Sequence, residues 1–206
     1  MPDFSIEDSF YAAGFRAVAG TDEAGRGPLC GCVTAAAVIL PRDLNIDGLN
    51  DSKKLSEKKR EKLFFEIVEK AISYGIASAS VEEIEELNIL TAAQLAMRRA
   101  AAMLDPQPDF LLVDGNTARN FPMKAKAVVS GDALSASIAA ASILAKVTRD
   151  RMCIEWDRDY PAYGFAAHKG YGTKAHIEAL RTFGPCPLHR PSFIKKLLVG
   201  TPFEFR

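Results

Sequence analysis

Two acidic residues, Asp22 and Glu23, stand side by side between an apolar run and a glycine-rich turn. The apolar run covers 16–21, and a second one, rich in small and β-branched residues, covers 33–40. Both runs predict buried strands joined as a hairpin. Carboxylates beside a buried strand are costly unless something cationic meets them. The pair therefore indicates a site for a cation.

The same combination of acid and glycine occurs twice more. Asp114 follows the apolar run 109–113 and precedes a glycine, and Asp132 follows Gly131 after the apolar stretch 125–129. Strands that are neighbours in an open α/β sheet bring their ends together, so these acids are expected to converge. Several carboxylates held together need cations, and ligands that are all oxygen favour Mg²⁺ or Mn²⁺ over zinc.

The order of the first two acids poses a geometric problem. Consecutive residues of a regular strand point to opposite faces, so Asp22 and Glu23 cannot both face one metal ion while the strand continues. The glycine-rich turn that follows predicts that the strand ends at this point.

The turn itself, Gly25-Arg26-Gly27, has features of a ligand-binding loop. Its glycines allow a ligand to approach the bare backbone N–H groups, and Arg26 offers several donors suited to phosphate. An ordinary hairpin with a solvated arginine is the alternative. A dinucleotide-binding loop is disfavoured, because Cys30 stands where the third glycine belongs and a strand follows rather than a helix.

Basic residues elsewhere could contact a polyanion. Lys53 and Lys54 fit either a solvated surface or a phosphate contact, while Lys146 and Arg149 share one side of a predicted helix. Lys169 lies in the segment 168–174, where basic side chains alternate with aromatics and glycines. That mixture suits a surface that follows a nucleic-acid backbone and stacks on it.

The chain has three histidines, and none lies near a cysteine or carboxylate at metal-ligand spacing. His168 is interpreted as a polar contact near a substrate, and His176 and His189 as structural residues.

The elements that must position these residues alternate between strand and helix and predict one α/β domain. Its core is expected at about 16–158, followed by a helical, substrate-contacting part at about 159–206, with 1–15 a loosely packed lead-in. Ser56 is predicted to cap the helix that follows it, and Thr91 a longer helix that extends to Leu104. Strands are expected at 74–80, 109–114 and 125–129, an acidic solvated helix at 81–88, and a small-residue helix from Ser135 to about Trp156.

Composition limits the classes of function. The 206 residues include 26 basic and 26 acidic side chains, so a polyanion must be met by a local patch rather than by net charge. The first twenty residues carry Asp3, Glu7 and Asp8 and no signal-peptide pattern, and the longest uncharged run is too short to span a membrane. A cytoplasmic protein with free thiols and no membrane association is expected.

Seven separated blocks together closely resemble the bacterial ribonuclease HII family, type 2 ribonucleases H. In chain order they are 20–29 (GTDEAGRGPL), 49–56 (LNDSKKLS), 113–116 (VDGN), 131–132 (GD), 139–150 (AAASILAKVTRD), 168–171 (HKGY) and 189–193 (HRPSF).

The resemblance implies a ribonuclease H-like mixed sheet flanked by helices and an endonuclease, expected as a monomer. Its expected substrates are RNA/DNA hybrids and DNA duplexes with embedded ribonucleotides, cut on the ribonucleotide's 5′ side to leave 3′-hydroxyl and 5′-phosphate ends, with a role in DNA repair and replication. Two divalent ions, Mn²⁺ or Mg²⁺, are expected with the substrate. The family's four metal-binding acids correspond to Asp22, Glu23, Asp114 and Asp132, its junction-reading turn to 25–27 and its sugar-stacking tyrosine to Tyr171.

Two positions depart from the family pattern, and two other functions remain open. Ser130 stands where many members have lysine, which weakens an expected phosphate contact, and Cys32 where many have proline. The alternatives are another two-metal nuclease of the same fold and a catalytically silent nucleic-acid-binding protein. The turn 25–27 and Tyr171 disfavour the first, and the complete set of four acids disfavours the second.

Overall fold

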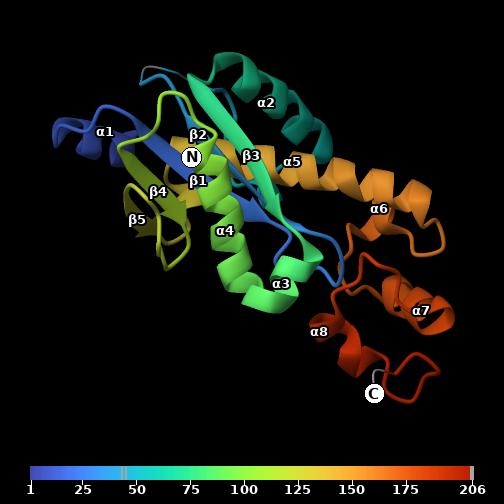
Figure 1. Cartoon of the computed structure of the whole chain (residues 1–206). Helices are drawn as coiled ribbons and strands as arrows, with labels where there is room; N and C mark the ends of the chain where they lie inside the picture. The colour runs from blue at the N-terminus through green and yellow to red at the C-terminus, as the bar shows by residue number, and fades with distance from the viewer. Residues whose placement is uncertain (43, 45, 205–206) are drawn as a thin grey trace.

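The computed structural model describes residues 1–42, 44 and 46–204; positions 205–206, at the end of the expected domain, lie outside the described residues. Figure 1 shows its strands and helices. The strands are β1 (Val18–Ala24), β2 (Val33–Ile39), β3 (Ser73–Ala79), β4 (Phe110–Asp114) and β5 (Lys124–Val128). The α-helices are α1 (Ser5–Ala12), α2 (Glu57–Lys70), α3 (Val81–Leu87), α4 (Ile89–Ala102), α5 (Ala136–Asp159), α6 (Phe165–His168), α7 (Lys174–Phe183) and α8 (Pro191–Ile194). Short 3₁₀ helices are η1 (Ser52–Lys54), η2 (Gly131–Ala133) and η3 (Lys195–Leu197).

Within the described residues, five strands form one mixed sheet in the order β3-β2-β1-β4-β5. β1 pairs with β2 antiparallel and with β4 parallel, and β4 pairs with β5 parallel. The central strand β1 therefore carries the first two acids between two partners. Because Thr21 is the register partner of Val113, Asp22 and Asp114 come next to each other.

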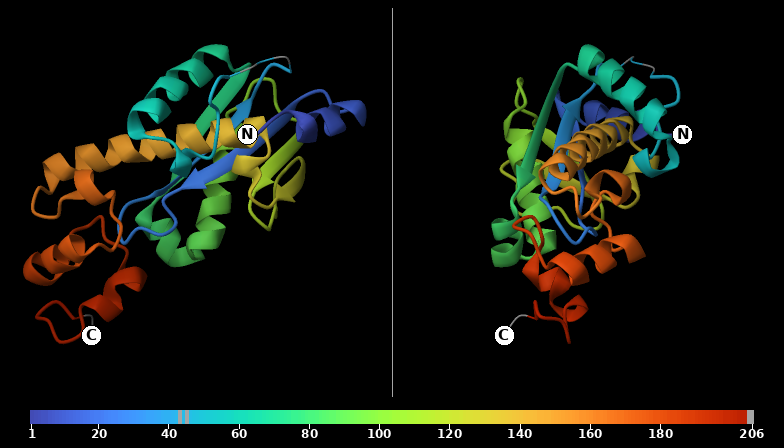
Figure 2. Two further views of the ribbon diagram at one scale, coloured as in Figure 1. Left: turned by 180° about the vertical axis from the view of Figure 1, so that it is seen from behind. Right: turned by 90° about the vertical axis from the view of Figure 1, so that its right-hand side faces the viewer.

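Helices cover both faces of the sheet, as the edge-on view in Figure 2 shows. One face packs on α5 with α2 behind it, and the other packs on α4. Helix α5 can approach the sheet closely because many of the buried residues in its first half are alanines and serines. At Gly20 a Cβ atom would overlap the α5 backbone at Ser137 and Ile138, so only glycine permits this distance.

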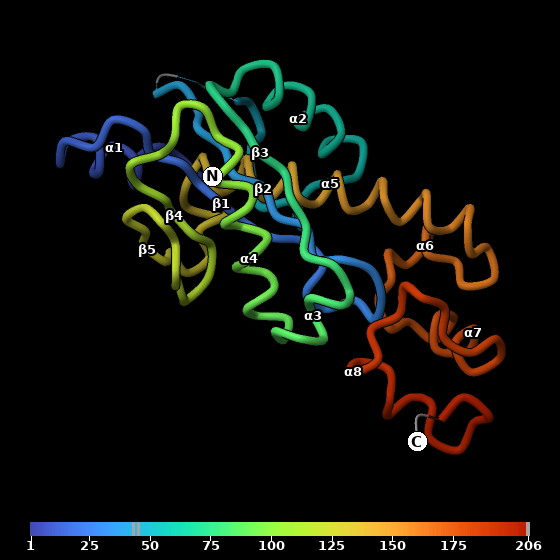
Figure 3. Tube along the Cα trace, in the orientation of Figure 1, coloured from blue at the N-terminus to red at the C-terminus, as the bar shows by residue number. Residues whose placement is uncertain are grey.

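The segment after α5 forms a separate group of short helices, α6 to α8 and η3, beyond one end of the sheet (Figure 3). Leu180, Ile194 and Leu198 make a small buried cluster that joins α7 to the last helices. An isolated antiparallel β-bridge between Cys30 and His189 connects this group to the loop between β1 and β2. No helix among the described residues is long and apolar enough to cross a membrane.

Three local predictions are wrong. Residues 5–12 form helix α1 instead of a loose lead-in, and its Glu7 is fully buried, accepting hydrogen bonds from Ser135 Oγ at 2.6 Å and Ser137 N at 2.9 Å. Helix α4 begins at Ile89 and is capped by Asn88, whose Oδ1 accepts from the N–H groups of residues 90 and 91, so Thr91 lies inside its first turn.

The third error concerns the end of β1. The strand is expected to end at the acids, but it continues through Ala24 because β2 pairs with it from Gly20 to Ala24. Ser56 does cap α2 as predicted, through Lys59 N.

Candidate active site

The four predicted carboxylates lie at one region of the sheet. Asp22 and Glu23 are carried by β1, Asp114 is the last residue of β4, and Asp132 lies in η2. The Asp114 carboxylate accepts hydrogen bonds from Gly131 N at 2.7 Å and from Asp132 N at 3.4 Å. These bonds hold η2, and with it the fourth acid, against the end of β4.

The strand that carries the first two acids turns them to opposite faces. Asp22 shares the face of Gly20, which packs on α5, while Glu23 shares the face of Ala19, which belongs to the core beneath α4. Asp22 is 4 % exposed, and its Oδ1 accepts from Glu23 N at 2.7 Å.

Burial and mutual repulsion disfavour the charged forms of these acids. Burial raises the pKa of Asp22 well above its usual range, and the neighbouring Glu23 and Asp114 carboxylates raise it further. Burial also raises the pKa of Glu23, against the opposing effect of Arg26. The pKa of Asp132 is raised by burial and then by Asp114. A cluster of this kind is stabilised by added positive charge.

Two basic side chains supply part of that charge. Arg26 Nη1 lies 3.0 Å from Glu23 Oε1, and Lys53 Nζ lies 3.7 Å from Asp132 Oδ2. Lys53 belongs to η1, whose first turn is capped by Asp51 through Lys53 N at 2.9 Å. Burial lowers the pKa of Lys53, but Asp22 and Asp132 outweigh that effect, so its net pKa is raised.

The donor set fits a hard divalent cation, since every predicted ligand atom is a carboxylate oxygen. In the described part of the chain, no three His, Cys, Asp or Glu side chains already surround a common point as ligands. Glu23 is engaged with Arg26, and Asp114 with the backbone of Gly131. One oxygen of each carboxylate, Glu23 Oε1 and Asp114 Oδ1, is thus held by the protein itself.

A cavity of about 500 Å³ adjoins the acids. Its walls include Glu23, the turn 25–27, Lys53, Lys146 and Tyr171. The Tyr171 side chain is 47 % exposed, and a Cβ atom built on Gly27 would lie 3.3 Å from Tyr171 Cε1. The tyrosine ring and the glycine turn thus form two neighbouring walls of one pocket.

The backbone of the turn requires glycine at its first position. Gly25 has φ 101°, and a Cβ atom there would overlap the side chain of Arg149. Arg149 was predicted to contact substrate, but it is 2 % exposed. Its guanidinium donates to Cys30 O at 3.0 Å, Cys32 O at 3.2 Å and Lys169 O at 2.9 Å. Arg149 also lines the cavity, so its guanidinium fixes the loops at that wall, and its contact with substrate stays a prediction.

Arg190 is the functional candidate that the sequence did not reveal. It is fully buried, and its guanidinium donates to five carbonyl oxygens of the segment 25–32, namely those of Gly25, Arg26, Pro28, Gly31 and Cys32, at 2.7–3.2 Å. The backbone of the glycine turn is therefore fastened from behind by one side chain. The block 189–193 contributed to the family resemblance, but nothing local distinguishes a buried arginine from a solvated one.

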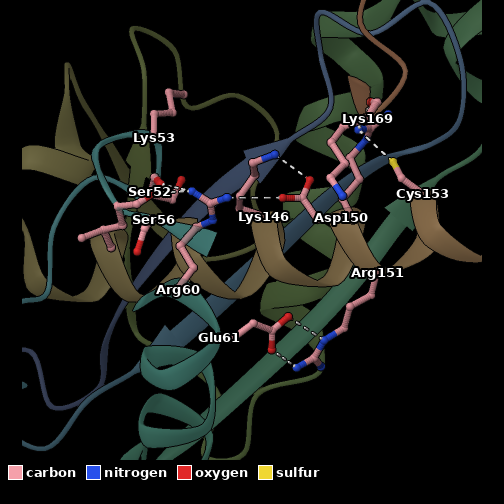
Figure 4. Close-up of polar contacts among 12 residues, drawn as sticks. Ser52, Lys53, Ser56, Arg60, Glu61, Lys146, Asp150, Arg151, Cys153 and Lys169 are labelled. Carbon is pink, nitrogen blue, oxygen red and sulfur yellow. Dashed lines mark hydrogen bonds and ion pairs between the residues drawn. The ribbon is translucent and has the colours of Figure 1, made fainter. Parts of the chain in front are cut away.

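Figure 4 shows the remaining predicted basic residues. Lys146 lines the cavity and is paired with Asp150 at 2.6 Å, an acid that Arg60 also approaches at 3.7 Å. Lys169 accepts the Arg149 hydrogen bond through its carbonyl and is absent from the cavity walls described above.

His168, which is predicted to be a polar contact near the substrate, has backbone partners at both ring nitrogens. Its Nδ1 accepts from Gly170 N at 3.2 Å, and its Nε2 is 2.8 Å from Tyr163 O. Both ring nitrogens are thus engaged with backbone, and the residue supports the turn that precedes Tyr171.

Known structures of similar fold include the ribonuclease H2 of Pyrococcus horikoshii OT3. It superposes with a TM-score of 0.72 at 27 % sequence identity over 89 % of this chain and 97 % of that one. The ribonuclease H-like fold inferred from the resemblance is therefore confirmed.

Sequence comparisons identify the family directly. The family model described as Ribonuclease HII matches residues 19–196. A relative named Ribonuclease HII from Marinomonas sp. (strain MWYL1) is 61 % identical over 186 residues, which are 89 % of this chain and 94 % of the relative. Another of that name, from Ruminiclostridium cellulolyticum, is 56 % identical over 94 % of this chain and 76 % of its own length. The chain belongs to the ribonuclease HII family, metal-dependent endonucleases that act on the RNA of RNA/DNA hybrids.

Proposed function

We propose that the protein cleaves the phosphodiester on the 5′ side of ribonucleotides embedded in duplex DNA, as well as RNA in hybrids, leaving 3′-hydroxyl and 5′-phosphate ends. The observation that carries the proposal is the pocket in which the 25–27 turn and the half-exposed Tyr171 face each other beside the acids. A 2′-hydroxyl both donates and accepts, so a backbone turn that a sugar can approach closely is suited to reading it.

In this proposal Asp22, Glu23, Asp114 and Asp132 hold two divalent ions, Mg²⁺ or Mn²⁺. When bound, such ions lower the pKa of a water nucleophile and stabilise the leaving oxygen of a phosphodiester. The chain's own residues align the substrate: the turn 25–27 binds the ribose, and the ring of Tyr171 packs on the sugar that follows. Lys53, Lys146 and Lys169 are proposed to contact phosphates, with Arg26 beside them.

The decisive experiment is cleavage of a DNA duplex that carries one ribonucleotide, with both product ends mapped. We expect one cut on the 5′ side of the ribonucleotide and no cut in an all-DNA duplex of the same sequence. Cleavage of an RNA/DNA hybrid without cleavage of the single-ribonucleotide duplex would reject the proposed specificity. Binding of both duplexes without any cleavage would instead identify a silent binding protein.

The oxygen-only ligand set predicts the metal requirement. Treatment with EDTA should abolish cleavage, and added Mg²⁺ or Mn²⁺ should restore it, because hard cations match carboxylate ligands. Zn²⁺ alone should not restore activity. Full activity in EDTA, or rescue by zinc alone, would contradict the site as assigned.

Tyr171→Ala is expected to lower kcat/KM on the single-ribonucleotide duplex at least about tenfold, since stacking contacts contribute about 1–3 kcal/mol. The half-exposed ring predicts little change in thermal stability. Tyr171→Phe keeps the ring and should stay near wild type. A large fall in melting temperature with normal cleavage would show that the ring serves packing instead.

We also propose that the enzyme acts as a cytoplasmic monomer in ribonucleotide removal. Size-exclusion chromatography with light scattering tests the oligomeric state, and a mass of twice 22.4 kDa would contradict it.

A further inference from the structure

A buried pair of histidines lies directly behind Tyr171. His176 at the start of α7 is 0 % exposed, and His189, in the segment before α8, is 3 % exposed. His176 Nδ1 lies 3.0 Å from Tyr171 O, and His176 Nε2 lies 3.1 Å from His189 Nε2. His189 Nδ1 in turn lies 3.0 Å from Cys186 N. The contacts form an unbroken chain from the tyrosine backbone to Cys186.

The groups at the two ends of this series of hydrogen bonds determine which ring nitrogens of His176 and His189 carry a proton. The Tyr171 carbonyl can only accept, so His176 carries its proton on Nδ1 and presents a bare Nε2. His189 must then donate from Nε2, which leaves its Nδ1 free to accept from Cys186 N. In this arrangement both rings are neutral, and His189 Nδ1 also lies 3.2 Å from Cys186 Sγ, which can likewise donate to it.

The pair connects two segments that form the wall of the pocket. On one side, the backbone at Tyr171 is held by His176 and by its own N–H, which donates to His168 O at 3.0 Å. On the other side, the residue after His189 is Arg190, whose side chain fastens the turn 25–27 and whose N–H donates to Leu29 O at 2.9 Å. The histidine pair thus connects the backbone at Tyr171 to the turn 25–27.

We propose that His176 and His189 are positioning residues for cleavage: their neutral, hydrogen-bonded pair sets the backbone of Tyr171 relative to the turn 25–27. The inference rests on the proposed role of Tyr171 in recognising the substrate sugar. Neither histidine lines the cavity, so both act through Tyr171.

Several titratable groups face the pair from the elements packed around it. His168 stacks on His176 with ring centroids 4.4 Å apart, and Tyr163 and Cys186 face His189. Across a second cavity that His189 lines, α3 presents Glu82 and Glu85, and Glu85 is engaged by Ser192 N at 3.0 Å and Oγ at 2.8 Å.

Adding a proton would disrupt the contact between the rings. A second N–H at His176 Nε2 would face the N–H of His189 across 3.1 Å. Burial, and then His176, lower the pKa of His189 to about 4, and burial likewise lowers the pKa of His176. The contribution of the pair to stability is therefore complete above about pH 6.5, the ordinary value, and is lost as the pH falls toward 4.

A double-mutant cycle tests the proposal. His176→Leu should lower kcat/KM on the single-ribonucleotide duplex at least about fivefold, mainly through KM, because it removes the side-chain bond to the Tyr171 carbonyl and leaves only the local backbone bonds to His168 and Thr173. In a Tyr171→Ala background the same change should have almost no further effect, since the residue that it positions is already gone. Equal factors in both backgrounds would overturn the proposal. Thr182→Val, an exposed change on the same helix, is the control and should leave kcat/KM unchanged.

A second measurement uses the wild-type protein, so it does not depend on whether His176→Leu folds. Nitrogen NMR of the ring atoms should show the Nδ1–H tautomer for His176 and the Nε2–H tautomer for His189, with His189 neutral down to about pH 4. His189→Gln keeps a donor toward His176 and should retain most of the activity. Opposite tautomers, or His189 titrating near pH 6.5, would reject the chain of hydrogen bonds.

The two proposals fail in different ways. If wild type cleaves hybrids but not the single-ribonucleotide duplex, the proposed specificity fails. Amide hydrogen exchange at residues 169–173 then still tests whether His176 holds the Tyr171 backbone. His176→Leu should raise the exchange rate there at least tenfold and leave the exchange rate of α4 unchanged. An unchanged exchange rate at 169–173 would show that the bond from His176 does not restrain this backbone.

Discussion

Asp22→Asn should reduce cleavage at least about 1,000-fold, which corresponds to about 4 kcal/mol of transition-state free energy, while the protein stays folded. The carboxylate is 4 % exposed and lies beside Glu23 and Asp114. Because burial and these neighbours disfavour its charge, an uncharged amide relieves repulsion in the metal-free protein. Activity falls because a neutral amide is a much weaker ligand for a hard cation. The unfolding free energy should therefore be unchanged or higher.

A matched control lies at the opposite end of β4. Asp109 immediately precedes the strand and accepts hydrogen bonds from Arg16 N at 2.8 Å and Ala17 N at 3.0 Å. Asp109→Asn should lower stability by about 1 kcal/mol and leave cleavage intact. Activity in Mg²⁺ and urea unfolding of both variants give the comparison. If Asp22→Asn kept even a tenth of wild-type activity, or lost stability as Asp109→Asn does, Asp22 would not be a metal ligand.

The strands and the position of the acids could be predicted because their signals are local. Continuous apolar runs ended by acid and glycine predicted β4 and β5, and the runs around the glycine turn predicted β1 and β2. The end of β1 could not be predicted. Pairing of Asp22 with Ala36 and of Glu23 with Ala35 extends the strand through both acids, and this depends on the partner strand rather than on the acids' own neighbours.

The buried side chains that hold the segments around the site do so through hydrogen bonds to residues that are distant in sequence. Glu7 reads as a solvated acid, yet Ser135 and Ser137, far along the chain, bury it at the start of α5. The donors of Arg149 and Arg190 reach carbonyls in the segment 25–32, more than one hundred residues away. No periodicity or spacing indicates such contacts. The acids that we propose as metal ligands could be identified in the sequence, and the side chains that hold their surroundings could not.

Arg190→Met should lower the unfolding free energy by about 3 kcal/mol or more, the largest stability effect that we expect in this chain. The substitution keeps much of the apolar volume but removes the Arg190 donor from five carbonyl oxygens of the segment 25–32, of which Cys32 O keeps its bond from Arg149 Nε. Burial, and then Arg149, lower the pKa of Arg190 to about 10, so the guanidinium is still charged at neutral pH and its hydrogen bonds are charge-assisted.

Arg190→Lys distinguishes the effect of the positive charge at this position from the effect of the planar arrangement of hydrogen-bond donors. A lysine retains the cation but has three donors, fewer than the five carbonyls that the planar guanidinium now reaches. We expect it to recover part of the stability and to leave kcat/KM on the single-ribonucleotide duplex at least about tenfold below wild type, because the turn 25–27 is no longer fixed. Arg181→Met, which removes one exposed bond to Leu197 O, should match wild type in both measurements. Wild-type discrimination in Arg190→Lys would show that the turn keeps its shape without the guanidinium, and the pocket would then owe its form to the glycines alone.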